Sequence, residues 1–172
     1  NLLYICYMKR KIISILLTVL TLNVYSQTDL ESLLFQKINE YRVEKGLNTL
    51  KWDDATYKST QVHTEYMVKN DKLCHTENSK TPSFTDRIRL FSDKNYIVGC
   101  ENVNKVYYTD NSIDKISDLI LSSWKSSKGH NSAMLSKRCT IGAVSCGDIS
   151  ESEDGYTFNF KYSTLVLWVK PN

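Results

Sequence analysis

The chain has 172 residues, with 22 Lys and Arg, 19 Asp and Glu, and a formal net charge of +3. Three of the cations and none of the acids lie within residues 1–26, so residues 27–172 carry 19 positive and 19 negative side chains. This neutral body argues against binding to nucleic acid or to an acidic membrane through net charge. Because Gly and Pro are few and no repeat or linker is visible, we expect residues 27–172 to form a single domain.

The first 26 residues have the pattern of a cleavable export signal. Met8, the expected start, is followed by three basic residues, by an apolar run from Ile12 to Val24, and by the small residue Ser26. The apolar run is too short, and too closely followed by polar residues, to span a membrane permanently. We therefore expect a secreted or periplasmic monomer without stable membrane insertion. An uncleaved anchor is the competing interpretation.

Two helices are predicted next. Thr28 and Glu31 fit a capping box, and an apolar stripe at helical spacing follows until Gly46. The stripe consists of Leu30, Leu33, Leu34, Ile38 and Tyr41. After a short connector over Leu50–Trp52, Asp53 can cap a second helix that runs to Met67. Its His63 is expected to be packed or hydrogen-bonded rather than functional.

The middle of the chain combines a short helix with a strand. A third helix is predicted over Pro82–Leu90, with three aromatic or apolar residues facing inward: Phe84, Ile88 and Phe91. Tyr96–Val103 is rich in strand-forming residues. Glu101 is unusual in such a strand, so it faces either solvent or a polar cavity.

A fourth helix is indicated by apolar residues at helical spacing, Ile113, Ile116, Leu119, Ile120 and Trp124. Gly129 is a natural helix stop, because Gly adopts a left-handed conformation without a Cβ penalty. His130 would then lie one residue past the stop, on backbone that leaves the helix at a sharp angle. A surface His in a loop is the alternative.

The C-terminal third is predicted to be mainly strands. Thr140–Ser145 forms one, Asp148–Gly155 is expected to be an acidic turn, and Tyr156–Tyr162 alternates as a half-buried strand does. Leu165–Val169 either continues that strand or returns as another. Because helices come first and strands mostly last, we predict an α+β fold with an antiparallel sheet.

Five short motifs then occur in order. They are Asn39-Glu40-Tyr41-Arg42, the run from Trp52 to Met67, His75, Gly99-Cys100-Glu101-Asn102-Val103, and Trp124-x-x-Ser-x-Gly-His130 with Ala133-Met-Leu and Ile141-Gly142. Together they resemble the CAP superfamily of cysteine-rich secretory proteins, antigen 5 and plant pathogenesis-related proteins. The last motif is similar to the bacterial branch. The resemblance extends from about Leu33 to the C-terminus.

This resemblance implies a three-layer α-β-α sandwich with a central antiparallel sheet and a polar groove. In the family, two His and two Glu line that groove, and the matching residues here are His75, Glu101 and His130. Ser127 stands where many members have the second Glu, three residues after the Trp. The loss of one carboxylate weakens any mechanism that needs a carboxylate pair.

The same residues suggest a metal site. Two neutral imidazoles can bind Zn²⁺ or a similar ion, with water completing the coordination shell. We expect His75 and His130 to be the ligands, at low occupancy because only two protein groups take part, and Glu101 to ligate or to accept an imidazole N–H. The alternative is a polar groove whose members only hydrogen-bond one another.

The expected function is that of a binding module. The resemblance points to binding roles, including sterols and other lipids, so a small-molecule or lipid ligand is expected in the groove of His75, Glu101, Ser127 and His130. The alternative is a metal-dependent peptidase or esterase, with His75, Glu101 and His130 as the candidate catalytic residues. Ser126 or Ser127 could complete a hydrolytic triad by residue type, but no Gly-x-Ser-x-Gly elbow is present.

Residues 27–172 contain four cysteines, Cys74, Cys100, Cys139 and Cys146. Export favours disulfides. The pair Cys139–Cys146 is disfavoured, because the ends of such a strand lie roughly 23 Å apart and a bridge needs Cα atoms within about 7 Å. Two pairings remain: Cys74–Cys139 with Cys100–Cys146, or Cys74–Cys146 with Cys100–Cys139. A zinc site that includes Cys74 or Cys139 is less expected, because exported thiols tend to oxidise.

Overall fold

A four-stranded mixed sheet forms the middle layer of the molecule. The computed structural model describes residues 27–93 and 98–169, so the predicted signal peptide and the start of the strand predicted from Tyr96 lie outside it. In spatial order the strands are β1 (Lys51–Trp52), β3 (Ile141–Glu153), β4 (Tyr156–Trp168) and β2 (Gly99–Tyr108). The three long strands are antiparallel, and β1 pairs with β3 in parallel. β2 therefore forms one edge of the sheet.

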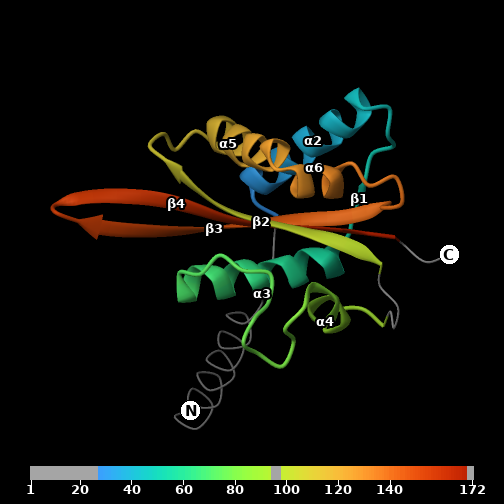
Figure 1. The fold of residues 1–172 in the computed structure, drawn as a ribbon, viewed down its shortest axis with the longest axis horizontal. Helices are drawn as coiled ribbons and strands as arrows, with labels where there is room; N and C mark the ends of the chain where they lie inside the picture. Colours follow the sequence, from blue (N-terminus) through green and yellow to red (C-terminus); the bar gives the residue numbers. More distant parts are fainter. Residues whose placement is uncertain (1–26, 94–97, 170–172) are drawn as a thin grey trace, which may run out of the picture.

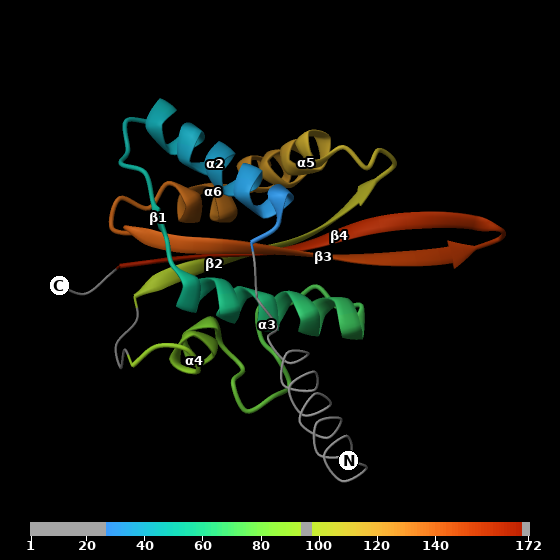
Figure 2. The same cartoon turned by 180° about the vertical axis from the view of Figure 1, so that it is seen from behind.

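Helices cover both faces of this sheet, as Figure 1 and Figure 2 show from opposite sides. One face carries α2 (Asp29–Glu44), α5 (Ile113–Ser126) and α6 (Lys128–Met134), and the other carries α3 (Asp54–Asn70) and α4 (Phe84–Arg89). This arrangement confirms the predicted α+β class and the three-layer α-β-α sandwich.

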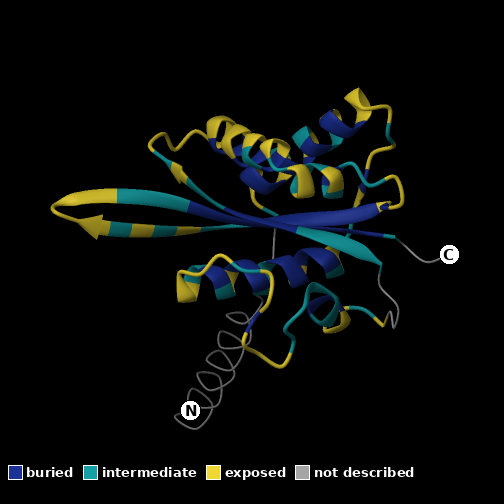
Figure 3. Cartoon of the chain, in the orientation of Figure 1, coloured by how far each residue is buried: buried dark blue, intermediate teal, exposed yellow. Residues whose placement is uncertain are grey.

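Residues on β4 alternate between two apolar cores. Leu165 and Leu167 pack with Trp124 beneath α2, α5 and α6, whereas Val166 and Trp168 face the α4 side. Successive side chains of a strand point to opposite faces, so a strand between two helical layers is apolar throughout. Beyond the helices the β3–β4 hairpin emerges into solvent (Figure 3), and Tyr156 near its tip is 71% exposed.

The predicted capping box at the start of α2 is present and also joins other layers. The Thr28 hydroxyl accepts from the Glu31 amide, and the Glu31 carboxylate accepts from the Thr28 amide at 2.8 Å. The same buried carboxylate accepts from the Tyr57 hydroxyl of α3 and from the Cys146 amide of β3. One cap residue thus connects α2 with both a second helix and the sheet.

Hydroxyl groups, rather than a strong apolar stripe, attach α3 to the sheet. Thr64 Oγ1 lies 2.6 Å from Ser145 Oγ and 2.8 Å from Thr164 Oγ1, and all three residues are buried. The Trp168 indole donates to Thr56 Oγ1 at 2.7 Å. Buried hydroxyls are tolerated because they are hydrogen-bonded, and this explains the weak apolar periodicity of the helix.

The C-terminal hairpin is longer than the sequence predicts. β3 continues to Glu153, so the expected acidic turn over Asp148–Gly155 is mostly strand. Only Asp154 and Gly155 form the turn, with φ of 49° and 80°. Two positive φ values match the right-handed twist of the flanking strands, and Asp-Gly is a preferred sequence for such a turn. β4 then runs without a break to Trp168, so Leu165–Trp168 continues the strand rather than forming another one.

Three smaller expectations differ from the structure. The predicted connector at Leu50–Trp52 contains the two-residue strand β1. Phe91, expected to face inward, is 39% exposed because α4 ends at Arg89. On α5, Ile113 and Leu119 are also exposed, and the buried stripe instead consists of Ile116, Ser117, Ile120, Leu121 and Trp124.

Two adjacent residues on α5 test this orientation. Ile120 is fully buried and Leu119 is 43% exposed. Ile120→Ala is expected to lower the free energy of unfolding by about 2–5 kcal/mol, because a core cavity remains. Leu119→Ala is expected to change it by no more than about 0.5 kcal/mol. Urea denaturation measures both, and equal losses would contradict the observed helix face.

Candidate functional site

Three sequence-predicted residues meet along the edge strand β2. Glu101 lies near the start of β2, His75 follows α3 in one helical layer, and His130 belongs to α6 in the other. His75 Nδ1 lies 3.0 Å from Glu101 Oε1. The ring centroids of His75 and His130 are 6.5 Å apart, with the rings tilted by 50°. The edge of the sheet thus brings together side chains from all three layers.

His130 is presented by a helix rather than by a loop. α5 ends at Ser126, and Ser127 takes an extended conformation with φ −88° and ψ 119°. Its hydroxyl accepts from the His130 amide at 3.4 Å and caps α6. Gly129 lies inside α6, so the prediction that it stops the preceding helix is wrong. A Ser N-cap satisfies a free helix amide, and that local signal determines the break.

Ser127 therefore has a local structural role. Its hydroxyl is used at the helix end, and a hydroxyl cannot carry the negative charge that Glu supplies at this place in many family members. The backbone of the same turn is held to β2, because Asn102 Nδ2 donates to the His130 carbonyl at 2.9 Å. This bond positions the helix turn that bears His130 against the strand that bears Glu101.

Glu101 is a buried carboxylate held by a buried guanidinium. Its side chain is 3% exposed, and Oε2 accepts a very short hydrogen bond from Arg87 Nη2 of α4. Arg87, which is 1% exposed, also donates to the Pro82 carbonyl at 3.0 Å and lies 3.3 Å from Glu77 Oε1. Arg87 therefore neutralises two carboxylates that the protein has removed from water.

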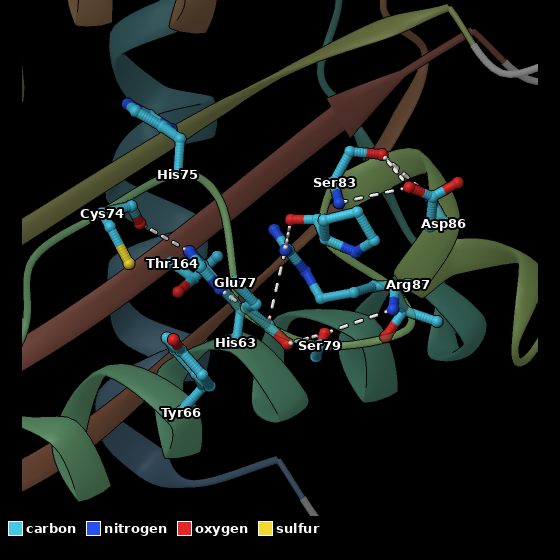
Figure 4. A network of polar contacts seen from close by, with 12 residues as sticks. His63, Tyr66, Cys74, His75, Glu77, Ser79, Ser83, Asp86, Arg87 and Thr164 are labelled. Carbon is cyan, nitrogen blue, oxygen red and sulfur yellow. Dashed lines mark hydrogen bonds and ion pairs between the residues drawn. The ribbon is translucent and has the colours of Figure 1, made fainter.

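His63 completes this network from α3 (Figure 4). The ring is fully buried, with Nδ1 2.9 Å from Glu77 Oε1 and Nε2 2.7 Å from the Cys74 carbonyl. Because a carbonyl oxygen only accepts, Nε2 donates to it, and Nδ1 faces the Glu77 carboxylate. As predicted, His63 is a hydrogen-bonded helix residue, and it holds the backbone just before His75.

Sequence reasoning missed Glu77 and Arg87. Glu77 is only two residues from His75, but nothing in the spacing shows that it is buried. Arg87 lies on a six-residue helix whose one visible signal was its apolar residues. The contacts of Arg87 with Glu77 and Glu101 join separate segments of the chain, so no local sequence pattern predicts them. One signal was available: if Glu101 is buried in its strand, its carboxylate needs a nearby cation, and Arg87 could have been considered for that role.

The two site imidazoles differ in their affinity for protons. The hydrogen bond to Glu101 raises the pKa of His75, against smaller opposing effects of burial and of Arg87. Burial lowers the pKa of His130, and the charge of His75 lowers it further. As the pH falls, His75 is therefore protonated first, while His130 remains neutral.

Proton NMR titration of the two rings tests this order. His75 is expected to titrate above the ordinary His value of about 6.5, and His130 below it. Glu101→Gln is expected to lower the midpoint of His75, because an amide stabilises an imidazolium less than a carboxylate does. Glu65→Gln, on the exposed side of α3, is the control. Midpoints in the reverse order would contradict the described geometry.

Two arginines of α4 allow the stability contribution of a buried charge to be compared with that of an exposed one. Arg87→Met leaves Glu77 and Glu101 buried without their cation, and we expect a loss of about 3–5 kcal/mol of unfolding free energy. Arg89 pairs with Asp86 at the surface, with its side chain 43% exposed, so Arg89→Met is expected to cost less than about 1 kcal/mol. Urea unfolding at pH 7 measures both variants. Similar costs would show that Arg87 is not the main counter-ion.

The predicted disulfide pairings both connect the two faces of the sheet. Cys74 packs with Met67, Val103 and Tyr162 on the α3 side, whereas the other three cysteines pack with the core under α2, α5 and α6. All four thiols are free. Both two-bridge pairings join Cys74 to a cysteine on the other face of the sheet, whereas Cys100 and Cys139 lie on the same face; neither pairing is formed in this structure, and both stay predictions.

The hollow beside α2 lies away from the His pair. It has a volume of about 820 Å³, lies on the outer side of α2 and is lined by Phe35, Val43 and Trp52 among polar residues. None of its lining residues belongs to the set of His75, Glu101 and His130. Within residues 27–93 and 98–169, no three His, Cys, Asp or Glu side chains are grouped as metal ligands. Within the same ranges, no helix is long and apolar enough to cross a membrane.

Known structures share this fold. An outer surface protein from Borrelia burgdorferi superposes with a TM-score of 0.58 at 14% identity, covering 85% of this chain and 96% of that one. An extracellular protein containing an SCP domain from Bacillus anthracis str. Ames gives 0.58 at 20% identity, and a cysteine-rich secretory protein from Staphylococcus aureus subsp. aureus Mu50 gives 0.50 at 18%. This chain is covered to 82% and 86% in these two comparisons, and it spans 40% of each of those proteins.

Identities this low show the fold alone, which is that of the SCP domain. The family model of cysteine-rich secretory proteins (CAP) matches residues 35–166, most of the chain. The protein therefore belongs to the CAP family, and the resemblance seen in its motifs is confirmed. No curated protein is similar enough to count as a match.

Proposed function

We propose that this protein is an exported CAP-domain binding module whose His75 and His130 hold a divalent metal, such as Zn²⁺, and whose surroundings take a small ligand. One observation carries the metal proposal: Glu101 accepts from His75 Nδ1, which leaves Nε2 as the ring nitrogen available to a metal. A carboxylate behind a ligating His is a recurrent arrangement that fixes the tautomer and strengthens the ligand. His130 faces the same place from the opposite layer.

The donor set fits a weakly held ion. Imidazole nitrogen is a good ligand for zinc and neighbouring transition metals. Zinc–nitrogen bonds are about 2.0–2.1 Å long, so rings whose centroids are 6.5 Å apart must approach each other. The His75 side chain is 55% exposed and has room to move, whereas Glu101 behind it is fixed. When bound, the metal would supply a positive charge for an anionic or carbonyl-bearing ligand.

Binding is favoured over hydrolysis by the position of the acids. The hydroxyl of Ser127 caps α6, and the Glu77 carboxylate is engaged by His63 and Arg87. Glu101 itself is held by Arg87 and is almost fully buried. No second carboxylate among the described residues is therefore placed at the His pair to act as a general base. A lipid, if one binds, is better accommodated by the hollow beside Phe35 and Trp52.

Export is supported by two independent features. The residues before Gln27 have the pattern of a cleavable signal. The structural relatives are described as an outer surface protein, an extracellular protein and a secretory protein. We extend that location to this chain as part of the proposal.

Zinc titration by calorimetry tests the metal site. Wild-type protein is expected to bind one ion per chain at pH 8, and His75→Ala or His130→Ala to weaken binding at least about tenfold, because half of the protein ligands are lost. Affinity is expected to fall as the pH drops through the raised pKa of His75, since a ligating imidazole must be neutral.

Lys128→Ala, an exposed change in the first turn of α6, is the matched control. His63→Ala is not used as one, because His63 supports the backbone before His75. Retention of full zinc affinity in either His variant would overturn the assignment. Zinc-dependent cleavage of a peptide or ester that both His variants lose would assign a hydrolase instead.

A further inference from the structure

Two cysteines approach each other at the end of β4. Cys100 is the second residue of β2, and Cys139 precedes β3. The neighbours Gly99 and Ile141 both pair with Trp168, one on each side of β4. Both cysteines line one hollow in the surface and pack against the same apolar core. We propose that Cys100 and Cys139 form a redox-active dithiol, in which Cys139 attacks a low-molecular-weight disulfide and Cys100 resolves the adduct.

A buried cation beside Cys139 supports this assignment. Arg42 is 1% exposed and donates to four carbonyls, those of Asn48, Met134, Ser136 and Cys139. Among the described residues, no carboxylate lies within ion-pair distance of its guanidinium. A buried charge without a counter-ion is unfavourable, and a thiolate at Cys139 is the anion placed to balance it.

The two thiols have opposite tendencies to ionise. The neighbouring Cys100 thiol lowers the pKa of Cys139, and Ser136, Arg42 and Arg138 act in the same direction, against the opposing effect of burial. The pKa of Cys100 is raised, first by the neighbouring Cys139 thiol and then by burial. Burial also raises the pKa of Cys74, and that of Cys146 to about 12. The thiolate is the nucleophile in disulfide exchange, so Cys139 is the thiol equipped to attack.

Cys139 is reached through hollows rather than from the open surface. The residue is 5% exposed, yet it lines one hollow of about 320 Å³ with Cys100 and Arg138, and another of about 310 Å³ with Arg42 and Lys137. Cations border both. This setting suits a small disulfide that carries carboxylates, such as oxidised glutathione.

The chemistry proceeds by two exchanges. The Cys139 thiolate attacks one sulfur of the external disulfide, whose S–S bond breaks and releases a thiolate. Cys100 then gives its proton to solvent and attacks the Cys139 sulfur, releasing the second thiolate. Two electrons pass from the protein to the external disulfide, which becomes two thiols. The product is a Cys100–Cys139 bridge.

This bridge would brace the proposed ligand site. Cys100 directly precedes Glu101, and its thiol lies 3.5 Å from the Ala133 carbonyl of α6. A covalent link to Cys139 would fix β2 against the segment that follows α6, the helix that bears His130. The redox pair is independent of metal binding, so each can be tested without the other.

Peptide mapping by mass spectrometry tests the proposal on the reduced full-length chain. After incubation with oxidised glutathione and acid quenching, we expect a Cys100–Cys139 bridge in the wild type. Cys100→Ser is expected to retain a glutathione adduct on Cys139, because no resolving thiol remains. Cys139→Ser is expected to form no adduct at Cys100. The exposed Arg138→Gln is expected to slow the reaction severalfold.

The double variant Cys74→Ser/Cys146→Ser serves as the control and should behave as the wild type. A bridge that includes Cys74 or Cys146, or an equally fast adduct on Cys100 in Cys139→Ser, would overturn the proposal. If a Cys variant fails to fold, iodoacetamide labelling of the wild type decides. Cys139 should then react first, with a rate midpoint below the ordinary Cys value of about 8.5, and faster labelling of Cys100 would refute the assigned roles.

Discussion

The buried ion pair between Arg87 and Glu101 is the interaction on which the site depends. A carboxylate that is 3% exposed is unfavourable unless a cation and hydrogen bonds compensate for its lost hydration. Arg87 supplies the cation and leaves the other carboxylate oxygen of Glu101 for His75. Because Arg87 is itself buried and tied to the Pro82 carbonyl, it fixes the direction of Glu101. The buried Glu101 carboxylate thereby sets the orientation of the His75 ring, whose side chain is otherwise largely exposed.

This dependence extends across the layers of the fold. Arg87 comes from α4, Glu101 from β2 and His130 from α6, so the site requires helices on both faces of the sheet. It lies at β2 because β2 is an edge strand, the place where the two helical layers meet without a strand between them. The Asn102–His130 hydrogen bond joins β2 to α6, one of those two helical layers. Loss of one layer would therefore separate the imidazoles even if each helix remained folded.

Much of the fold could be predicted because its signals are local. The Thr28–Glu31 cap and the existence of the α5 helix and of a strand from Tyr156 are signalled within one segment, and the order of the motifs identifies the family. The buried face of α5, by contrast, was only partly predicted, and Tyr156–Tyr162 does not alternate in burial. The polar inner face of α3 has no such pattern, since Thr64 and its hydroxyl partners satisfy one another only in the assembled sheet. Arg87 and Glu77 were not predicted for the same reason, because their contacts form only in the folded molecule. The break at Ser127 was misplaced because a cap and a Gly stop compete within two residues.

The tautomer of His75 tests most directly whether Glu101 orients the site. Long-range ¹H–¹⁵N correlation spectra of the metal-free protein, recorded above the titration of His75, distinguish the two ring nitrogens. The structure predicts a proton on Nδ1, donated to Glu101, and an unprotonated Nε2 that is available to a ligand. A proton found on Nε2 would contradict this account, because Glu101 would then not hold the ring.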